Sequence, residues 1–253
     1  MNKKQWAACF PGEDPGMLAR LFTLIEDAFD GIKGVSNEFF PPALCKKIEE
    51  LPGGLPEGAL FYAPADAPHK VFASSLAEAQ AGVSLLKIQD GYPKDPLKHK
   101  DYLGALMSLG LKREKFSDLW LDGEVCYLPV VRSLADFVMQ EMTRVGRHSV
   151  RIESLPIEAW GTLKDPRVEE VLLVASLRLD AIIARMGNLS RGKAVQAIET
   201  GLVKQNDRVE TSSKKDVRKG DVLSLRGKGK IEVGDVLGTT RKGALHLQIL
   251  RYR

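Results

Sequence analysis

The chain has 253 residues, of which 44% are hydrophobic and 28% are charged, and its formal net charge is +4. These proportions are typical of a globular protein, and the length suits one large domain or two to three small ones. No stretch approaches the roughly eighteen apolar residues that a membrane-spanning helix requires, so we expect no membrane segment.

Cysteine and histidine are scattered along the sequence. Cys9, Cys45 and Cys126 have no CxxC spacing, and the four histidines are isolated. A disulfide framework or a metal site needs such residues at close, regular spacing. Near the N-terminus, Asp14 and Pro15 come before any apolar run of signal-peptide length, so we expect no secretory signal. These features predict a cytoplasmic protein with no bound metal and no cofactor.

The charge is distributed unevenly. Residues 172–253 contain 17 Lys and Arg against 8 Asp and Glu, whereas residues 1–171 contain 20 against 25. A basic module joined to a mildly acidic body is typical of proteins that bind a polyanion. A basic surface that serves only solubility is the alternative.

The first segment, residues 1–75, is predicted to be mainly helical. A helix is expected in MLARLFTLIEDAFDGI and a second, shorter one in PPALCKKIEEL, which begins with two prolines. Proline and glycine interrupt residues 52–68, so loops are expected there. The apolar residues that recur at helical spacing in the first helix are Leu18, Leu21, Phe22, Ile25 and Phe29.

The second segment, residues 76–168, alternates between strand and helix patterns. GVSLLKIQD predicts a strand, HKDYLGALMSLGL a helix, and Asp122-Gly123 a hairpin turn between two strands. The next helix is expected to start at Ser133 as its N-cap and to end near Gly146, and HSVRIESL then alternates as a strand. The order βαββαβ predicts a ferredoxin-like domain, a fold that serves many unrelated functions.

The third segment, residues 169–253, follows a loop predicted at Lys164-Asp165-Pro166. It contains two short helices and then short strands with a turn at Asn206-Asp207. The first helix is expected to have Ser176 as its cap and Gly187 as its stop, and the second to run from a Ser190 cap to Gly201. The apolar positions of the first helix are Leu179, Ile182, Ile183 and Met186.

The second of these helices opens with Arg191 and Lys193, although cations in a first turn are mildly unfavourable. The loss of a few tenths of a kcal/mol is small beside the gain from several phosphate contacts. Arginine's planar fork suits phosphate oxygens, and free amides at a helix start also donate to them. We therefore predict a phosphate-binding surface formed by Arg178, Arg185, Ser190, Arg191, Lys193, Lys204, Asn206, Arg208, Lys214, Lys215, Arg226 and Lys228, which the resemblance described below makes an RNA-binding surface.

Some of these residues have an alternative structural role. Arg178 could instead pair with Asp180, which we expect to be structural, and Ser190 is primarily a helix cap. A second phosphate-binding surface, which the resemblance described below would make a second RNA surface, is predicted at Lys98, Lys100, Lys112, Arg113 and Lys115, where ordinary charges near a helix C-terminus are an equally good interpretation. Trp120 and Tyr127 could stack on bases, but aromatic residues at such positions are more often part of the core.

The segment LRLDAIIARMGNLSRGKAVQAIETGLVKQND, with SSKKDVRKGDVLSLRG after it, resembles the S4-type RNA-binding domain, also called the αL RNA-binding motif. Asp207 stands where many members have glycine, which we expect to alter the turn geometry at most. The motifs that carry the resemblance are Arg178-Leu179-Asp180, Ser190-Arg191, Gly201-Leu202-Val203 and Lys219-Gly220-Asp221.

HKDYLGALMSLGLKREKFSDLWL and VGRHSVRIESLP resemble the bacterial YlmH family, whose members combine an amino-terminal region, a central RNA-binding domain and a C-terminal S4-type domain. The resemblance runs from about residue 36 to 238 and departs at Phe61 to Lys70, where members usually show a Gly-Gly-Tyr stretch. It implies an α+β protein that binds ribosomal RNA or tRNA without catalysis. It also implies a ribosome-associated factor for obstructed large subunits, and older naming links the family with cell division.

Two other functions compete with this interpretation. Pseudouridine synthases also carry an S4-type domain and use an Arg-Leu-Asp motif whose aspartate is the nucleophile. Here that motif lies inside the binding domain and runs into AIIAR, and no second copy occurs. A methyltransferase is not supported either, because it would need a glycine-rich loop that leads into a helix, and the glycines of RGKGK lead into a strand pattern. The second rival is an interaction protein of cell division, whose basic face would not respond to RNA.

Overall fold

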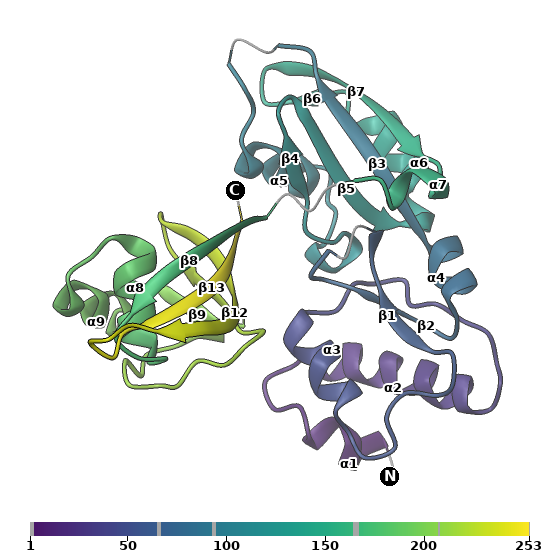
Figure 1. Cartoon of the computed structure of the whole chain (residues 1–253). Coiled ribbons are helices and arrows are strands. Elements are labelled where there is room, and N and C mark those ends of the chain that lie inside the picture. Colours follow the sequence, from purple (N-terminus) through teal and green to yellow (C-terminus); the bar gives the residue numbers. More distant parts are fainter. Residues whose placement is uncertain (1–2, 65–66, 93–94, 164–166, 207, 253) are drawn as a thin grey trace. The chain divides into compact units, whose positions relative to one another are not determined.

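The computed structural model describes residues 3–64, 67–92, 95–163, 167–206 and 208–252 (Figure 1). Its contacts divide the chain into two compact units, Met1–Lys164 and Asp165–Arg253. Both units combine helices with antiparallel sheets, which confirms the predicted α+β class. The division into three domains stays a prediction, and the loop predicted at residues 164–166 lies outside the described residues. Within the described ranges, no helix is both long and apolar enough to cross a membrane.

The N-terminal unit begins with helices α1 (Lys3–Ala8), α2 (Pro15–Phe29) and α3 (Pro42–Glu49). α2 begins at Pro15, before the predicted segment that starts at Met17, and the Asp14 carboxylate caps it by accepting a hydrogen bond from the Met17 amide at 2.6 Å. Four of its predicted apolar positions are buried, but Phe29, at the last turn, is 60% exposed. Phe29 therefore follows the predicted helical spacing but lies outside the core. α1 was not predicted from the sequence.

Two short strands follow, the first inside residues 52–68, where loops were expected, and the second just after that segment. β1 (Leu60–Tyr62) pairs antiparallel with β2 (Val71–Ala73), so the mainly helical prediction for residues 1–75 is incomplete. The Phe61 and Phe72 rings meet edge to face with centroids 5.7 Å apart. Aromatic packing against α2 and α3 therefore stabilises strands that are too short to give a sequence signal.

The central part of this unit has the predicted strand and helix order. Its sheet runs β4-β5-β3-β7-β6, so the first long strand, β3, lies between β5 and β7 as in a ferredoxin-like fold. The elements are α4 (Leu76–Gly82), β3 (Val83–Asp90), α5 (His99–Ser108), η2 (Arg113–Lys115), β4 (Trp120–Asp122), β5 (Val125–Val131), α6 (Arg132–Glu141), β6 (Arg144–Val145), β7 (His148–Leu155) and α7 (Ile157–Trp160).

The boundaries of α6 differ from the prediction. The helix begins one residue before Ser133, after the N-cap Val131, and the Ser133 hydroxyl donates to the Asn37 side-chain oxygen at 2.8 Å. The helix ends at Glu141, because the segment expected to be its last turn pairs as β6 with β7. Gly146 lies in that hairpin turn with a φ of 57°.

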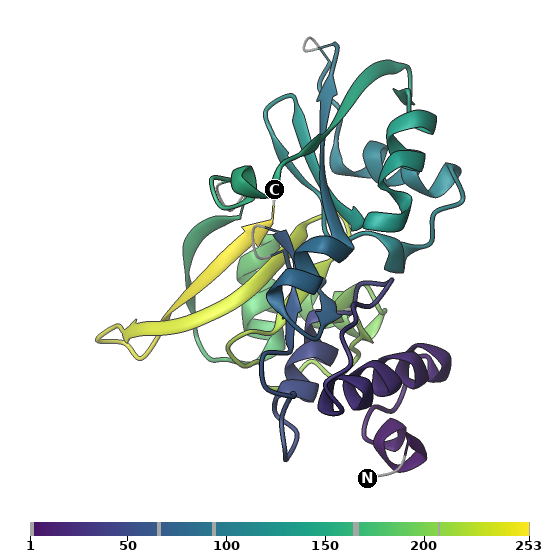
Figure 2. The same cartoon turned by 90° about the vertical axis from the view of Figure 1, so that its right-hand side faces the viewer.

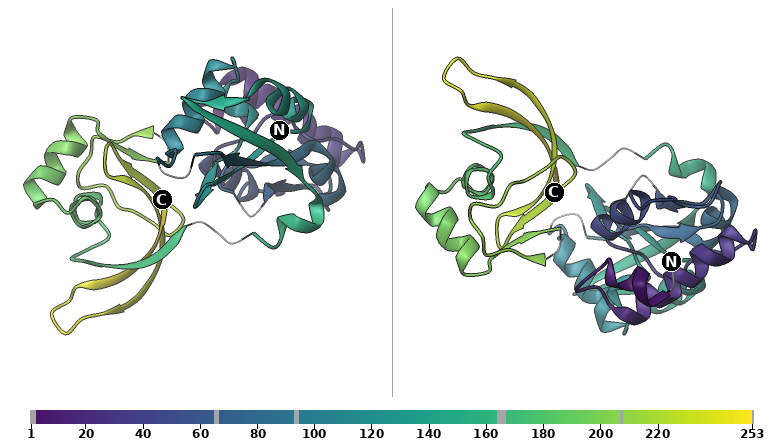
Figure 3. Two further views of the ribbon diagram at one scale, coloured as in Figure 1. Left: turned by 90° about the horizontal axis from the view of Figure 1, so that it is seen from above. Right: turned by 90° about the horizontal axis from the view of Figure 1, so that it is seen from below.

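The C-terminal unit contains a sheet in the order β10-β9-β11-β12-β13-β8. Helices α8 and α9 cover one face of it, and the β12–β13 hairpin projects from the rest of the unit (Figures 2 and 3). The elements are β8 (Val168–Val174), α8 (Leu179–Gly187), α9 (Arg191–Glu199), β9 (Val203–Gln205), β10 (Arg208–Val209), β11 (Val222–Leu225), β12 (Gly229–Thr239) and β13 (Leu245–Tyr252).

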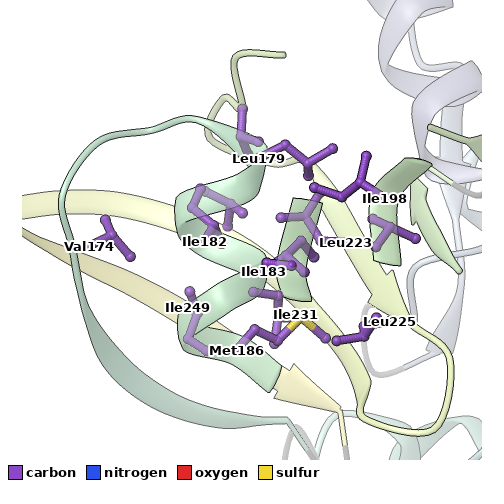
Figure 4. Close-up of a cluster of buried hydrophobic side chains, with 14 of the residues drawn as sticks. Val174, Leu179, Ile182, Ile183, Met186, Ile198, Leu223, Leu225, Ile231 and Ile249 are labelled. Atoms are coloured by element: carbon purple, nitrogen blue, oxygen red, sulfur yellow. The ribbon is translucent and has the colours of Figure 1, made fainter. Parts of the chain in front are cut away.

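The core of this unit lies between α8, α9 and the sheet. Figure 4 shows Ile183 and Met186 of α8 lying against Leu223 and Ile231 of the strands. The predicted apolar stripe of α8 is buried as expected. Since all members of this cluster come from residues 174–249, the C-terminal unit has a hydrophobic core of its own.

Gly187 allows α8 to approach β11 closely. A Cβ at this position would lie 2.7 Å from a Leu225 methyl carbon. We expect Gly187→Ala to lower the free energy of unfolding by about 1–3 kcal/mol through overpacking. Gly192 of α9 is the matched control, because a Cβ there meets nothing within 4 Å. Gly192→Ala should be neutral or slightly stabilising. Urea unfolding followed by circular dichroism measures both, and equal stability of the two variants would contradict the packing argument.

Candidate RNA-binding surface

The start of α8 is fixed by a neighbouring loop. The backbone amides of Leu179 and Asp180 donate to the carbonyls of Lys215 and Ser213, at 2.9 and 3.1 Å. These bonds satisfy amides that a helix start leaves open. The N-cap residue is Arg178 in an extended conformation, so the prediction of Ser176 as the cap is wrong. The loop at residues 213–215 is thereby placed beside the first turn of α8.

Two arginines converge on one buried carboxylate. Arg178 donates to both Asp180 oxygens, at 3.2 and 3.0 Å, and Arg191 does the same at 3.0 and 3.3 Å. The Asp180 side chain is 3% exposed, whereas those of Arg178 and Arg191 are 36% and 54% exposed. We call these three residues the Asp180 clamp. It joins the first turns of α8 and α9.

Electrostatics within the clamp favour the ionised carboxylate. Burial alone would raise the pKa of Asp180, but hydrogen bonds and charge from Arg191 and Arg178 outweigh it and lower the pKa. Charge-assisted bonds of this kind are about twice as strong as neutral ones. The alternative considered for Arg178, an ion pair with Asp180, is therefore confirmed. The same pairing of Arg191 was not predicted.

Ser190 caps α9 as predicted. Its hydroxyl accepts a hydrogen bond from the Lys193 amide at 3.3 Å. The cap positions the side chains of Arg191 and Lys193 in the first turn of α9, where Lys193 is exposed. The helix ends at Glu199, and Gly201 follows with a φ of 73°, which agrees with its predicted role as terminator.

Asn206 has a structural role in the turn after β9. Its φ is 54°, its amide nitrogen donates to Asp221, and its side-chain oxygen accepts from the Val222 amide, both at 2.8 Å. Asp221 also accepts from the Arg218 amide at 2.8 Å. The Lys-Gly-Asp motif thus fixes the turn through its aspartate. Asp207, the second residue of the predicted turn, lies outside the described residues, and RNA contact by Asn206 stays a prediction.

The other cations predicted to contact RNA differ in whether they form ion pairs within the protein. Lys215 bonds to the Glu210 carboxylate, and this bond, with others from backbone amides, lowers the pKa of Glu210. Arg208 is exposed on β10. Several exposed cations form no ion pair with any residue that the structure describes, and these are Arg185, Lys193, Lys204, Lys214, Arg226 and Lys228.

The structure separates the residues of the predicted second surface. Arg113 donates to the Phe116 carbonyl at 2.6 Å and to Asp118 at 3.3 Å, and Lys115 donates to the Asn37 carbonyl at 2.6 Å. These two side chains are thus engaged within the fold, which supports the structural alternative for them. Lys112 is exposed. Lys98 and Lys100 instead line a hollow at the other end of α5, beside the β6–β7 turn.

For Trp120, the structure also decides between the two predicted roles, base stacking and core packing. Trp120 is buried and stacks on Tyr127, with ring centroids 5.5 Å apart. Trp120 belongs to the cluster that includes Phe39 and Trp160, so the core interpretation holds for it. Among the described residues, no group of three or more histidine, cysteine or carboxylate side chains is placed to hold a metal ion.

A hollow of about 240 Å³ opens beside the clamp. Its polar lining comes from Arg185, Asn188 and Arg191, and the rest is apolar. Asn188 caps the C-terminus of α8 in the left-handed conformation, with a φ of 51°. Neither this hollow nor Asn188 was predicted to have a role. The one signal was the asparagine directly after Gly187, since asparagine often ends a helix in this conformation.

Two family models match the chain. Residues 78–159 match the "Putative RNA-binding domain in YlmH", and residues 177–223 match the "S4 domain". A similar protein is the Ribosome-associated protein quality control protein P2 of Bacillus subtilis (strain 168), which is 38% identical over 131 residues. That match covers 51% of this chain and 50% of the relative, so the chain spans about half of the relative's length.

A solved structure, Cell division protein ylmH from Streptococcus pneumoniae, matches with 17% identity and a TM-score of 0.44. The match covers 59% of this chain and 94% of that one. The two domain matches are independent of it, and both describe RNA-binding families.

Proposed function

The chain belongs to the YlmH-like family of S4-domain RNA-binding proteins, and on this basis we propose that it binds structured ribosomal RNA or tRNA without catalysing a reaction. The observation that carries the proposal is the Asp180 clamp, which gathers two arginines from two helix starts. Lys193 lies in the first turn of α9, and Lys214 lies in the loop at residues 213–215, which bonds to the start of α8. Arg178 and Arg191 use Nε and Nη2 on Asp180, which leaves the Nη1 group of each for phosphate oxygens. These donors, the lysines and the N-terminus of α9 together suit phosphate groups.

The relative's name supports a ribosomal setting. A protein that shares 38% identity with this chain over 131 residues is named for ribosome-associated quality control. We propose that the chain acts on obstructed large ribosomal subunits in the cytoplasm, and the relative's name supports the ribosomal part of this proposal. The RNA partner would be ribosomal RNA, tRNA or both. The exposed lysines near α5, Lys98 and Lys100, are proposed as a second contact.

The geometry of Asp180 speaks against the pseudouridine synthase alternative. A nucleophilic aspartate must reach the base that it attacks, with at least one oxygen exposed to it. Each carboxylate oxygen of Asp180 accepts one hydrogen bond from Arg178 and one from Arg191, and the Asp180 side chain is 3% exposed. A structural carboxylate fits these contacts better than a catalytic one. A role as a cell-division interaction protein has no comparable geometric support.

RNA binding and its salt dependence test the proposal. We expect the full chain to bind a stem-loop RNA with an affinity that falls steeply as salt rises, because phosphate contacts release counterions. Lys193→Ala combined with Lys214→Ala should weaken binding and reduce the slope of log affinity against log salt by about 1–2. Both lysines are exposed, and neither pairs with a described residue, so the fold should be unaffected.

The control is Arg241→Ala combined with Lys242→Ala. These cations lie in the turn of the β12–β13 hairpin, which projects from its unit (Figure 2). Removing them changes the net charge equally but should alter affinity and slope much less. An equal effect of both double variants would refute the surface at α8 and α9. Failure of the unaltered chain to bind RNA would refute the function itself.

A further inference from the structure

The hollow beside the Asp180 clamp has the composition of a site for a flat, polar-edged ring. Its lining contains no carboxylate and consists of Ala175, Ala181, Ala184, Arg185, Asn188, Leu189 and Arg191. We propose that it receives one unpaired nucleobase of the bound RNA. This inference rests on the proposed RNA-binding function and adds a means of telling single-stranded from paired RNA.

Small side chains create the space. Three alanines and one leucine form the apolar lining, and a volume of about 240 Å³ is left open. One water takes about 30 Å³ in the liquid, so the hollow has room for a group much larger than a single water. Apolar walls with a few polar groups are typical of small-ligand pockets, and a base presents an apolar face to such walls.

The polar rim suits the edge and the phosphate of a nucleotide. The Asn188 amide has both donors and an acceptor, as recognition of a base edge requires. Its side chain is exposed and forms no hydrogen bond with the described part of the chain. Arg185 is likewise exposed and forms no ion pair with a described residue, so its guanidinium remains available for phosphate or for stacking.

Arg191, the third polar residue of the lining, is held in place by the Asp180 clamp. Arg191 uses Nε and Nη2 on Asp180, and its side chain is still 54% exposed. A guanidinium held in this way offers a pre-positioned plane beside the hollow. RNA-binding proteins commonly stack unpaired bases on arginine planes and read their edges by hydrogen bonds. A base within an intact duplex cannot enter such a hollow.

Asn188 can be substituted in a way that removes its side-chain amide without changing the end of α8. Its φ of 51° is a conformation that glycine adopts without strain, so Asn188→Gly keeps the helix end and removes only the amide. Ala184→Leu is a complementary change, because it fills the hollow without altering any charge. Because Ala184 also packs against the core cluster, the asparagine variant guards against an effect on folding.

The experiment compares two RNA probes with the full chain: a stem-loop with an unpaired loop, and an uninterrupted duplex of the same stem sequence. We expect Ala184→Leu and Asn188→Gly each to weaken binding to the stem-loop, by about tenfold for Ala184→Leu, which removes a stacked base. Affinity for the duplex should not change. The salt slope should also stay the same for both variants, because neither removes a phosphate contact.

Three results would overturn the inference. Unchanged stem-loop binding by both variants, with Lys193→Ala/Lys214→Ala still weakening it, would refute the base site and leave the proposed function intact. An equal loss on stem-loop and duplex would assign the hollow to general backbone contact. Failure of the unaltered chain to bind either probe would refute the proposed function together with the inference.

Discussion

Replacing Asp180 with asparagine is expected to lower the free energy of unfolding of the C-terminal unit by about 3 kcal/mol at neutral pH. The change leaves Arg178 and Arg191 close together without the carboxylate that both now contact. Breaking a buried ion pair from one side destabilises a protein by about 3–5 kcal/mol. Because the arginines are partly exposed, we expect the lower end of that range. Urea unfolding followed by circular dichroism measures the change.

The effect of this substitution should depend on pH. Since the pKa of Asp180 is lowered in the folded chain, its contribution is complete above the unfolded value of about 3.9. It is lost as the pH falls through the folded pKa. The difference in stability between the natural chain and Asp180→Asn should therefore be constant near neutrality and shrink on acidification. A difference that grows in acid would contradict this assignment.

Asp216→Asn provides the matched control. Asp216 is exposed, and its backbone forms a bridge with Arg178, so the two aspartates lie in the same region. We expect a change of less than about 0.5 kcal/mol from this substitution, as is usual at the surface. If both asparagine variants were equally stable, the Asp180 clamp would have no special energetic role.

Ile183→Ala is expected to destabilise the C-terminal unit by about 2–5 kcal/mol while leaving the N-terminal unit unaffected. Ile183 is fully buried at the centre of the C-terminal core, and that core contains residues of this unit alone. All three tryptophans, Trp6, Trp120 and Trp160, belong to the N-terminal unit. Their fluorescence therefore follows one unit, and circular dichroism follows both.

The measurement is a pair of unfolding curves on the same sample. We expect the circular dichroism curve of Ile183→Ala to show an early transition that tryptophan fluorescence does not show. Ile183→Val is the control and should lower stability by about 0.5–1.5 kcal/mol. A tryptophan transition that shifts together with circular dichroism would show that the two units unfold cooperatively.

Sequence patterns predicted the elements whose signals are local. The Ser190 cap, the hairpin signalled by Asp122-Gly123 and the apolar stripe of α8 all depend on residues within a few positions of one another. The hairpin turn itself is one residue later than predicted, at Gly123 and Glu124, because Asp122 still pairs with Val125. The strand β8 was missed because it is an edge strand that exists through pairing with β13, more than seventy residues later. Short strands such as β1 and β2 likewise depend on partners that a local pattern does not contain.

The same limit applies to the candidate site. The basic side chains at the helix starts are visible in the sequence, and the structure places Arg178, Arg191 and Lys193 there. The partner of Arg191 could not be predicted, since Asp180 is eleven residues away and on another helix. Ser176 and Ser133 were predicted as caps from residue type alone. In the structure, backbone bonds to the loop at residues 213–215 start α8 later, and Ser133 bonds to Asn37 instead.

The Asp180 clamp has a consequence for the kinetics and cost of RNA association. A free arginine side chain loses about 0.5–1.5 kcal/mol of conformational freedom when a partner immobilises it. Arg178 and Arg191 are already held by the fold through two bonds each. Under the proposed function, most of that entropy is lost during folding and little is lost at docking. The clamp would therefore act as a rigid template, whose benefit is faster productive encounters and slower release.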